Sequence, residues 1–174
     1  MKKDNWILKA FIISFVIAFQ FNLISNVVIS KFDNIIILII IDIIFIMIGI
    51  LFDICGTAVL TAEESTFHSM SSKRVKGAKT AVNLIKNNHR IASIFCDIIG
   101  DICGIISGGI CALISILIST KYNVSAVLIL VLISSITSSL TIGGKAIGKQ
   151  YAIKKSDIIV HNLSKILEKF KRCK

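Results

Sequence analysis

Long apolar runs separated by short polar segments set the pattern of this chain. Four runs stand out, at about residues 6–29, 35–60, 91–119 and 124–142. Each exceeds the roughly 17 residues that an α-helix needs to cross a bilayer. Only helices and closed barrels can span lipid, and unbroken apolar runs of this length exclude barrel strands. The pattern therefore predicts an all-α integral membrane protein with four transmembrane helices.

A second pattern, with the period of an amphipathic helix, marks two polar segments. Between the second and third runs, the apolar positions that share one helical face are Val75, Ala78, Val82 and Ile85. In the C-terminal tail, the corresponding positions are Ile159, Leu163, Ile166 and Phe170. Lysines lie opposite the first stripe and flank the second. Because helices with one basic and one apolar face bind at lipid interfaces, both are predicted to lie on the inner leaflet.

Composition and charge add an orientation. The 174 residues are 55% apolar, with a mean hydropathy of +0.84, which leaves no room for a separate soluble domain. The net charge is +10, carried mainly by the N-terminus, the segment 61–90 and the tail, whereas the other two loops hold Lys31 and Lys121. By the positive-inside rule, both termini and the segment 61–90 face the cytoplasm of a multi-pass plasma-membrane protein. No interleaving of aromatic and basic residues indicates nucleic-acid binding.

The cysteines and the first run exclude further classes. The sequence holds five cysteines, none in a C-x-x-C pair, and four lie in apolar runs, where a thiol acts as a small hydrophobe. The first run is too long for a signal peptide and has no small-residue cleavage site, so it is predicted to be an anchor. No nucleophile elbow or H-E-x-x-H motif occurs, so an enzyme is not predicted.

Four aspartates interrupt the apolar runs: Asp42, Asp53, Asp97 and Asp101. An acid at the centre of a transmembrane helix costs at least about 2.5–3.5 kcal/mol, so each is a functional candidate. If the third run enters the membrane near residue 91, Asp97 lies roughly 9 Å deep and Asp101 roughly 15 Å deep. Because they are four residues apart, the two acids are predicted to share a helical face.

Hydroxyls and small residues complete the polar pattern. Ser134, Ser138 and Thr141 fall on one face of the fourth run, which fits either a polar lining or close helix packing. The third run repeats small residues every four positions, at Cys96, Gly100, Gly104 and Gly108. This stripe is predicted to pack against another helix, about 60° around from the acids.

We expect the polar groups to converge on one internal cavity. Its predicted members are Asp53, Asp97, Asp101, Ser134, Ser138 and Thr141, with Glu63 and Glu64 at the inner mouth. All of these are oxygen donors, which are the ligands that Mg²⁺ prefers, and no histidine joins them. The sequence therefore favours a hard cation over a softer metal.

Three stretches of the chain follow, in order, the motifs of a known family. Residues 61–65 read TAEES and precede a basic helix, residues 97–101 read DIIGD, and residues 141–152 read TIGGKAIGKQYA. They resemble the S-x-S-E, G-N-x-L-V-N and G-E-x-x-P-K segments of the transmembrane domain of the cyclin-M (CNNM)/CorB/CorC magnesium transporters. Aspartates replace both asparagines of the second segment, and the likeness covers about residues 40–172.

The resemblance implies a fold and a ligand set. Residues 31–148 would form a core that dimerises and binds Mg²⁺ between its helices, with residues 1–30 as an extra anchor and residues 149–174 as a basic juxtamembrane helix. Carried over, Thr61, Asp97 and Asp101 become ligands and Glu64 a supporting carboxylate. Lys145 stands where the family has its glutamate, and an ammonium group cannot coordinate Mg²⁺, although it could neutralise an aspartate. The cytoplasmic regulatory domains usual in the family have no counterpart, so nucleotide sensing is not expected.

Two functions are compatible with these features. The first is a small divalent-cation (Mg²⁺ or Co²⁺) transporter or transporter-like protein, in which the supporting polar lining is Asp53, Ser134, Ser138, Thr141 and Lys145. The second is a degenerate relative without transport, a membrane scaffold or regulator that pairs with another transporter. That pairing would use the basic helices and the packing stripe of Gly100, Gly104 and Gly108.

Overall fold

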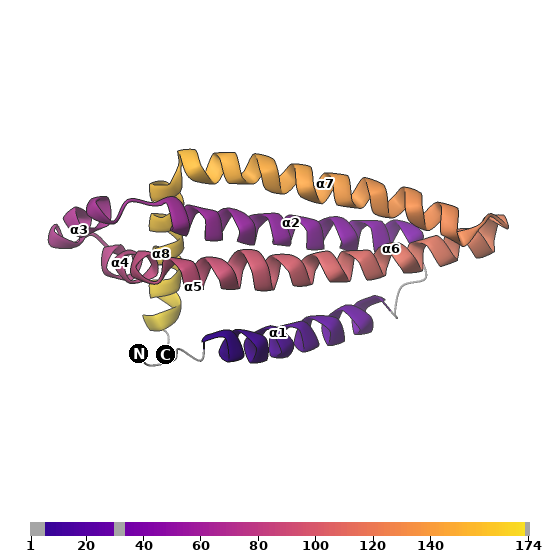
Figure 1. The fold of residues 1–174 in the computed structure, drawn as a ribbon, viewed down its shortest axis with the longest axis horizontal. Helices are drawn as coiled ribbons and strands as arrows, with labels where there is room; N and C mark the ends of the chain where they lie inside the picture. The colour runs from indigo at the N-terminus through magenta and orange to yellow at the C-terminus, as the bar shows by residue number, and fades with distance from the viewer. Residues whose placement is uncertain (1–5, 30–33, 173–174) are drawn as a thin grey trace. The chain divides into compact units, whose positions relative to one another are not determined.

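The computed structural model of the protein describes residues 6–29 and 34–172, and within these ranges every regular element is a helix (Figure 1). The prediction of an all-α fold is therefore confirmed for this part of the chain. Several residues used to predict orientation or helix faces lie outside the described residues or have side chains that are not described: Lys2, Lys3, Lys31, Phe170 and Lys174.

The helices follow one another with short connections. In chain order they are α1 (Trp6–Ile29), α2 (Ile35–Thr61), α3 (Glu64–Ser72), α4 (Ala78–Lys86), α5 (Asn88–Ala92), the π-helix η1 (Ser93–Ile99), α6 (Gly100–Tyr122), α7 (Ala126–Lys154) and α8 (Ser156–Arg172). Helices α5, η1 and α6 run on directly from each other and correspond to the third apolar run. Helix α7 continues past the predicted end at Ile142 as far as Lys154.

Three stretches are long and apolar enough to cross a membrane. They are Ile35–Thr61, Asn88–Tyr122 and Ala126–Lys154. Helix α1 has the predicted bounds, but its apolar stretch within the residues searched, Leu8–Leu23, is shorter. The structure therefore supports a membrane protein with three candidate spans, and a fourth span remains a prediction.

The contacts of the chain divide it into two compact units. Unit 1 comprises the chain up to Gly49 together with Ile98–Gly143, and unit 2 comprises Ile50–Asp97 together with Gly144–Lys174. Helices α2 and α7 each contribute to both units, so a residue's position along these helices decides which neighbours it meets.

Unit 1 has an apolar core with buried residues from α2 and from the η1–α6 stretch, and α1 contacts α6. Its buried apolar residues are Leu38 and Ile46 from α2, and Ile98, Ile102, Cys103, Ile106, Ile110, Cys111 and Ile114 from the η1–α6 stretch. A Cβ atom at Gly49 would lie 3.3 Å from the Cβ of Cys103. The missing side chain of Gly49 therefore allows α2 and α6 to approach closely.

The core of unit 2 contains residues from five helices. Its buried members are Ala58 and Val59 of α2, Phe67 of α3, Ala81, Val82 and Ile85 of α4, Ala152 of α7 and Val160 of α8. Gly77 precedes α4 with a φ of +85°, a left-handed conformation that suits glycine. A Cβ atom at Gly77 would lie 2.9 Å from the hydroxyl oxygen of Ser164, so α8 packs against the start of α4.

The apolar faces of the two amphipathic helices of unit 2 are covered to different extents. Ala78, Val82 and Ile85 of α4 are buried in the protein, and Val75 lies outside the helix. This apolar face therefore covers protein rather than the inner leaflet, which corrects the prediction for α4. In α8 the fully buried residues are Val160 and Ser164, whereas Ile166 of the predicted stripe is exposed. The periodicity of apolar residues alone predicted both helices, but it did not predict what their faces contact.

Candidate functional site: a hydroxyl-lined groove in unit 1

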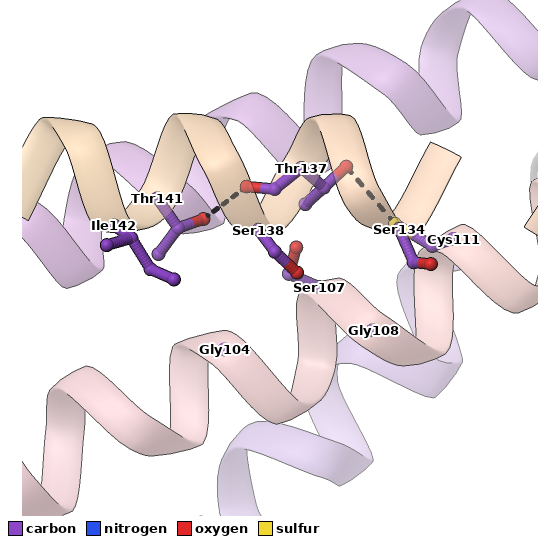
Figure 2. A pocket seen from close by; sticks show the side chains of 9 residues that line it. All are labelled: Gly104, Ser107, Gly108, Cys111, Ser134, Thr137, Ser138, Thr141 and Ile142. Carbon is purple, nitrogen blue, oxygen red and sulfur yellow. Dashed lines mark hydrogen bonds between the residues drawn. The ribbon is translucent and has the colours of Figure 1, made fainter. Parts of the chain in front are cut away.

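A groove with a volume of about 180 Å³ lies between α6 and α7 in unit 1 (Figure 2). Its lining residues are Gly104, Ser107, Gly108 and Cys111 from α6, and Ser134, Thr137, Ser138, Thr141 and Ile142 from α7. In Figure 2 the polar side chains of the two helices point toward the same space. The structure therefore brings together Ser134, Ser138 and Thr141, which the sequence placed on one polar face.

Helical spacing explains why these residues share the groove. Positions 134, 137, 138 and 141 recur at intervals of three and four, which places them on one side of α7. On α6, a Cβ atom at Gly104 or Gly108 would have no neighbouring atom within 4 Å. The two glycines therefore hollow out this side of the groove instead of serving as a close contact within the described chain.

Several hydroxyl protons of the groove are already used within their own helix. Ser134 donates to the carbonyl of Val131 at 3.3 Å. Thr141 donates to the carbonyl of Thr137 at 2.8 Å (Figure 2). A hydroxyl that donates in this way keeps its oxygen lone pairs as acceptors. The α7 side of the groove therefore presents electronegative oxygen, which suits a cation or water better than an anion.

A buried acid lies beside this lining. Asp42 of α2 is only 6% exposed, and the hydroxyls of Ser107 and Thr137 lie near its carboxyl group. The thiol of Cys111 lies 3.4 Å from Thr137 Oγ1 and 4.0 Å from Asp42 Oδ2. Neither Asp42 Oδ1 nor Ser107 Oγ has a hydrogen-bond partner of acceptable geometry among the described residues. Two oxygens deep in unit 1 are thus left available to a ligand.

A second, much smaller cavity adjoins the groove. It shares Gly104, Ser107 and Thr141 with the groove and is otherwise lined from α2 and the start of α6. Its volume of about 10 Å³ corresponds to roughly one water molecule. Ser107, whose hydroxyl lies near the Asp42 carboxyl group, therefore borders space on two sides.

Asp53, the other buried acid of α2, lies in unit 2 and has a cationic neighbour. It is 2% exposed, and its Oδ2 lies 3.7 Å from Nζ of Lys149 on α7. The Cys96 thiol of η1 donates to the backbone oxygen of Asp53 at 3.6 Å. Gly56, one turn along α2, would meet the Cys96 sulfur if it carried a Cβ. Asp53 thus belongs to a packed junction of unit 2 and not to the groove.

The residues predicted as metal ligands are distributed over both units. In unit 2, Thr61 donates to the carbonyl of Thr57 at 3.0 Å, and Glu64 lies 3.0 Å from His68 Nε2. Asp97 is exposed on η1, whereas Asp101 is exposed in the first turn of α6, in unit 1. The wider turn of a π-helix alters the angular spacing on which a shared face for these two acids was predicted. Their role as ligands remains a prediction.

The remaining predicted site residues are also distributed over both units. Lys145 lies in unit 2 and is half-buried, with an electrostatic or hydrogen-bonding neighbour. In the packing stripe, Gly100 is buried, whereas Gly104 and Gly108 line the groove. Among the residues that the structure describes, no three His, Cys, Asp or Glu side chains gather closely enough to hold a metal.

Sequence reasoning missed four members of the groove region: Asp42 as a group beside it, and Ser107, Cys111 and Thr137 as lining. Thr137 was detectable, because it falls between Ser134 and Thr141 on the same helical side. Ser107 precedes Gly108 of the small-residue stripe, but the sequence does not state which helix that stripe faces.

No family model, no curated protein and no solved structure matches this chain.

Proposed function

We propose that the chain is a small divalent-cation transporter, or a transporter-like membrane protein, that holds Mg²⁺ or Co²⁺ at oxygen atoms within the membrane. The observation that carries the proposal is the pair of buried oxygens, Asp42 Oδ1 and Ser107 Oγ, which lack hydrogen-bond partners among the described residues beside a hydroxyl-lined groove. Unsatisfied polar groups inside a membrane protein are costly and are retained where they serve a pathway or a ligand.

The chemistry of the groove supports a hard cation. Its polar lining is oxygen, apart from the thiol of Cys111. Asp101 precedes Gly104 by three residues on α6 and so lies on the same helical side, which supplies a second carboxylate in unit 1. Mg²⁺ keeps several of its waters and binds through one or two carboxylates, and a volume of about 180 Å³ has room for those waters.

The proposal includes a topology. Helix α1 serves as a fourth, N-terminal span, and the termini and the basic segment from α3 to α5 face the cytoplasm of a plasma-membrane protein. The packing of α8 against α4 supports this arrangement, because it requires the second loop and the tail to lie on the same side of the membrane. The proposed relationship to the CNNM/CorB/CorC transporters, including a homodimer, rests on the sequence motifs.

Transport can be tested with the purified chain in proteoliposomes loaded with a Mg²⁺-sensitive dye. We expect Asp42→Asn to reduce Mg²⁺ or Co²⁺ flux strongly, since loss of a supporting polar group typically costs about 10–100-fold in metal affinity or activity. Ser138→Ala should reduce flux by a smaller factor. Its matched control is Ser139→Ala, because Ser139 is exposed on the same helix and does not line the groove.

Two results would overturn the transport proposal. One is wild-type flux equal to that of empty vesicles. The other is equal flux in the wild type, Asp42→Asn and Ser138→Ala, which would separate any transport from the groove. Parallel measurement of Asp97→Asn and Asp101→Asn would test the ligand set that the resemblance implies.

The open glycine surface favours a second candidate function, a scaffold that receives a helix of a partner transporter or of a second copy. Gly104 and Gly108 have no neighbouring atom within 4 Å of a Cβ position, so a helix could approach there. Gly104→Leu should then release a co-purified partner. Gly109→Leu is the matched control, because Gly109 is equally open and lies outside the groove. Retention of the partner by Gly104→Leu would exclude this function.

A further inference from the structure

Helix α8 has two faces of different character, and one of them packs against the other helices of unit 2. Val160 and Ser164 are fully buried, and Ile159 and Leu163 pack partly against the core. The contact between Ser164 and the Gly77 position leaves no space for a side chain there. These contacts fix the rotation of α8 about its own axis, and so determine which residues face outward.

The outward face combines lysines with large apolar residues. Ile158 is 59% exposed and Ile166 is 54% exposed. The lysines beside them at helical spacing, all exposed, are Lys155, Lys165 and Lys169. The acids of α8, Asp157 and Glu168, are half-buried and lie along one edge of this face, between it and the buried face, where Glu168 is one turn from Lys165. The outward face is therefore basic and apolar at the same time.

The chain itself brings this face to a membrane boundary. Helix α7 is a candidate span that ends at Lys154, and Lys155 alone separates it from the start of α8 at Ser156. Figure 1 shows α8 turning away from the line of α7 at this point. Tyr151, in the last turn of α7, is exposed, and the ammonium group of Lys155 lies 5.4 Å from the centre of its ring. Tyrosine and lysine at the end of a span are typical of the headgroup region.

We propose that the face formed by Lys155, Ile158, Lys165, Ile166 and Lys169 binds anionic phospholipid at the membrane surface. The isoleucines would enter the boundary between headgroups and acyl chains, while the ammonium groups contact lipid phosphates. An in-plane helix binds in this way when lysines flank its apolar residues. This inference concerns a different surface from the groove and does not rest on cation transport.

The test uses the full chain in detergent, with retained lipids counted by native mass spectrometry during titration with phosphatidylglycerol or phosphatidylcholine. The variant is K155Q/K165Q/K169Q. The matched control is K73Q/K79Q/K86Q, which removes the same charge from exposed lysines of the α3–α4 segment. Since each lysine near an anionic surface contributes about fivefold, we expect the first variant to weaken phosphatidylglycerol binding by roughly 100-fold. The control should remain close to the wild type.

A second measurement reports on the isoleucines without depending on charge. In a Trp6→Phe background, Ile158→Trp should be quenched by brominated lipid, and more strongly when phosphatidylglycerol is present. Equal phosphatidylglycerol binding by both triple variants would overturn the proposal, as would equal retention of phosphatidylcholine by the wild type. Loss of a dimer in K155Q/K165Q/K169Q, without a change in lipid binding, would assign the face to a second copy and also overturn it.

Discussion

The two units use the same helix, α7, in opposite ways. In unit 1, α7 faces a groove with Ser134, Thr137, Ser138 and Thr141. None of the described α7 residues in unit 1 is buried. In unit 2, Gly148 and Ala152 of α7 are buried, and Ala152 belongs to the core. A single continuous helix therefore has a polar surface that lines a groove at one end and small residues packed in an apolar core at the other.

The two buried aspartates of α2 repeat this contrast. Asp42, in unit 1, has neutral hydroxyl and thiol neighbours, and one of its oxygens is unpaired within the described residues. Asp53, in unit 2, lies beside the ammonium group of Lys149. Each acid has one buried oxygen without a hydrogen-bond partner among the described residues, Asp42 Oδ1 and Asp53 Oδ2, but only Asp53 Oδ2 has a cation beside it. A buried acid with a cation nearby is suited to a structural role, whereas one without a fixed cation is suited to an exchangeable one. This difference is consistent with the proposal that the cation site lies in unit 1.

The largest effect that would sharpen this comparison is expected in the core of unit 2. Phe67→Ala removes a fully buried ring and should lower the free energy of unfolding by about 3–5 kcal/mol, measured by thermal unfolding in detergent. Thr137→Val, in the groove of unit 1, should cost less, about 1–2 kcal/mol, since it removes a hydroxyl that accepts a weak hydrogen bond from the Cys111 thiol and lies near the Asp42 carboxyl group. Phe11→Ala, at a ring that is 77% exposed, is the control for the loss of an aromatic residue.

A smaller effect should come from the Asp53–Lys149 pair, and it should be asymmetric. Lys149→Met leaves a buried carboxylate without its cation and should cost about 2–3 kcal/mol, below the range for fully buried pairs because Lys149 is half exposed. Asp53→Asn leaves a lysine that can reach water, so it should cost less than about 1 kcal/mol. The double variant should be more stable than Lys149→Met alone. Strict additivity of the two changes would show that the pair does not interact.

The glycines of α7 provide a third comparison along one helix. A Cβ at Gly148, in unit 2, would lie 2.8 Å from Cγ1 of Ile54, so Gly148→Ala should cost about 1–2 kcal/mol through overpacking. Gly143, in unit 1, has no atom within 4 Å of that position. Gly143→Ala should therefore preserve stability or raise it slightly, because alanine favours helix more than glycine does. Equal losses at both positions would contradict the division into a tight and an open region.

The smallest expected effect is a pH dependence in α8, outside the spans. Burial lowers the pKa of His161, and the positive charge of Lys165 lowers that pKa further. The unfolded chain therefore binds a proton at this histidine more readily than the folded chain does, and stability decreases as the pH falls below about 6.5. His161→Gln should flatten the unfolding curve between pH 7 and pH 5. Parallel curves for the variant and the wild type would remove His161 as the cause.

Apolar run length was sufficient to predict the long apolar helices of the chain but not their partners. Helix α1 has the bounds predicted for the first run, and α2 ends one residue beyond the second, because backbone hydrogen bonds favour helix wherever apolar residues continue. Helix α7 exceeds its apolar run because helix formation does not require apolar residues, and Gly148 and Ala152 pack well in unit 2. The start of the π-helix at Ser93 had no signal in the apolar pattern.

The groove was predictable only in part, because it depends on which helix faces which. The period of Ser134, Ser138 and Thr141 correctly grouped three lining residues. The same kind of period suggested that Gly104 and Gly108 form a close packing surface, yet within the described chain they face open space. Asp42 and Asp53 are almost in phase along α2, and only their neighbours, Ser107 and Lys149, distinguish them. Such neighbours come from segments that are distant in sequence.

The single residue between α7 and α8 has a consequence for how this chain tolerates insertions and deletions. Adding one residue at Lys155 would turn everything after it by about 100°. Ser164 would then rotate away from Gly77 and Val160 out of the core of unit 2, while Ile158 and its flanking lysines would turn toward the protein. Substitutions at the junction change only one side chain, whereas a change in length disturbs every contact of the last helix. Natural variants of the protein should accordingly vary in composition at this junction while conserving its length.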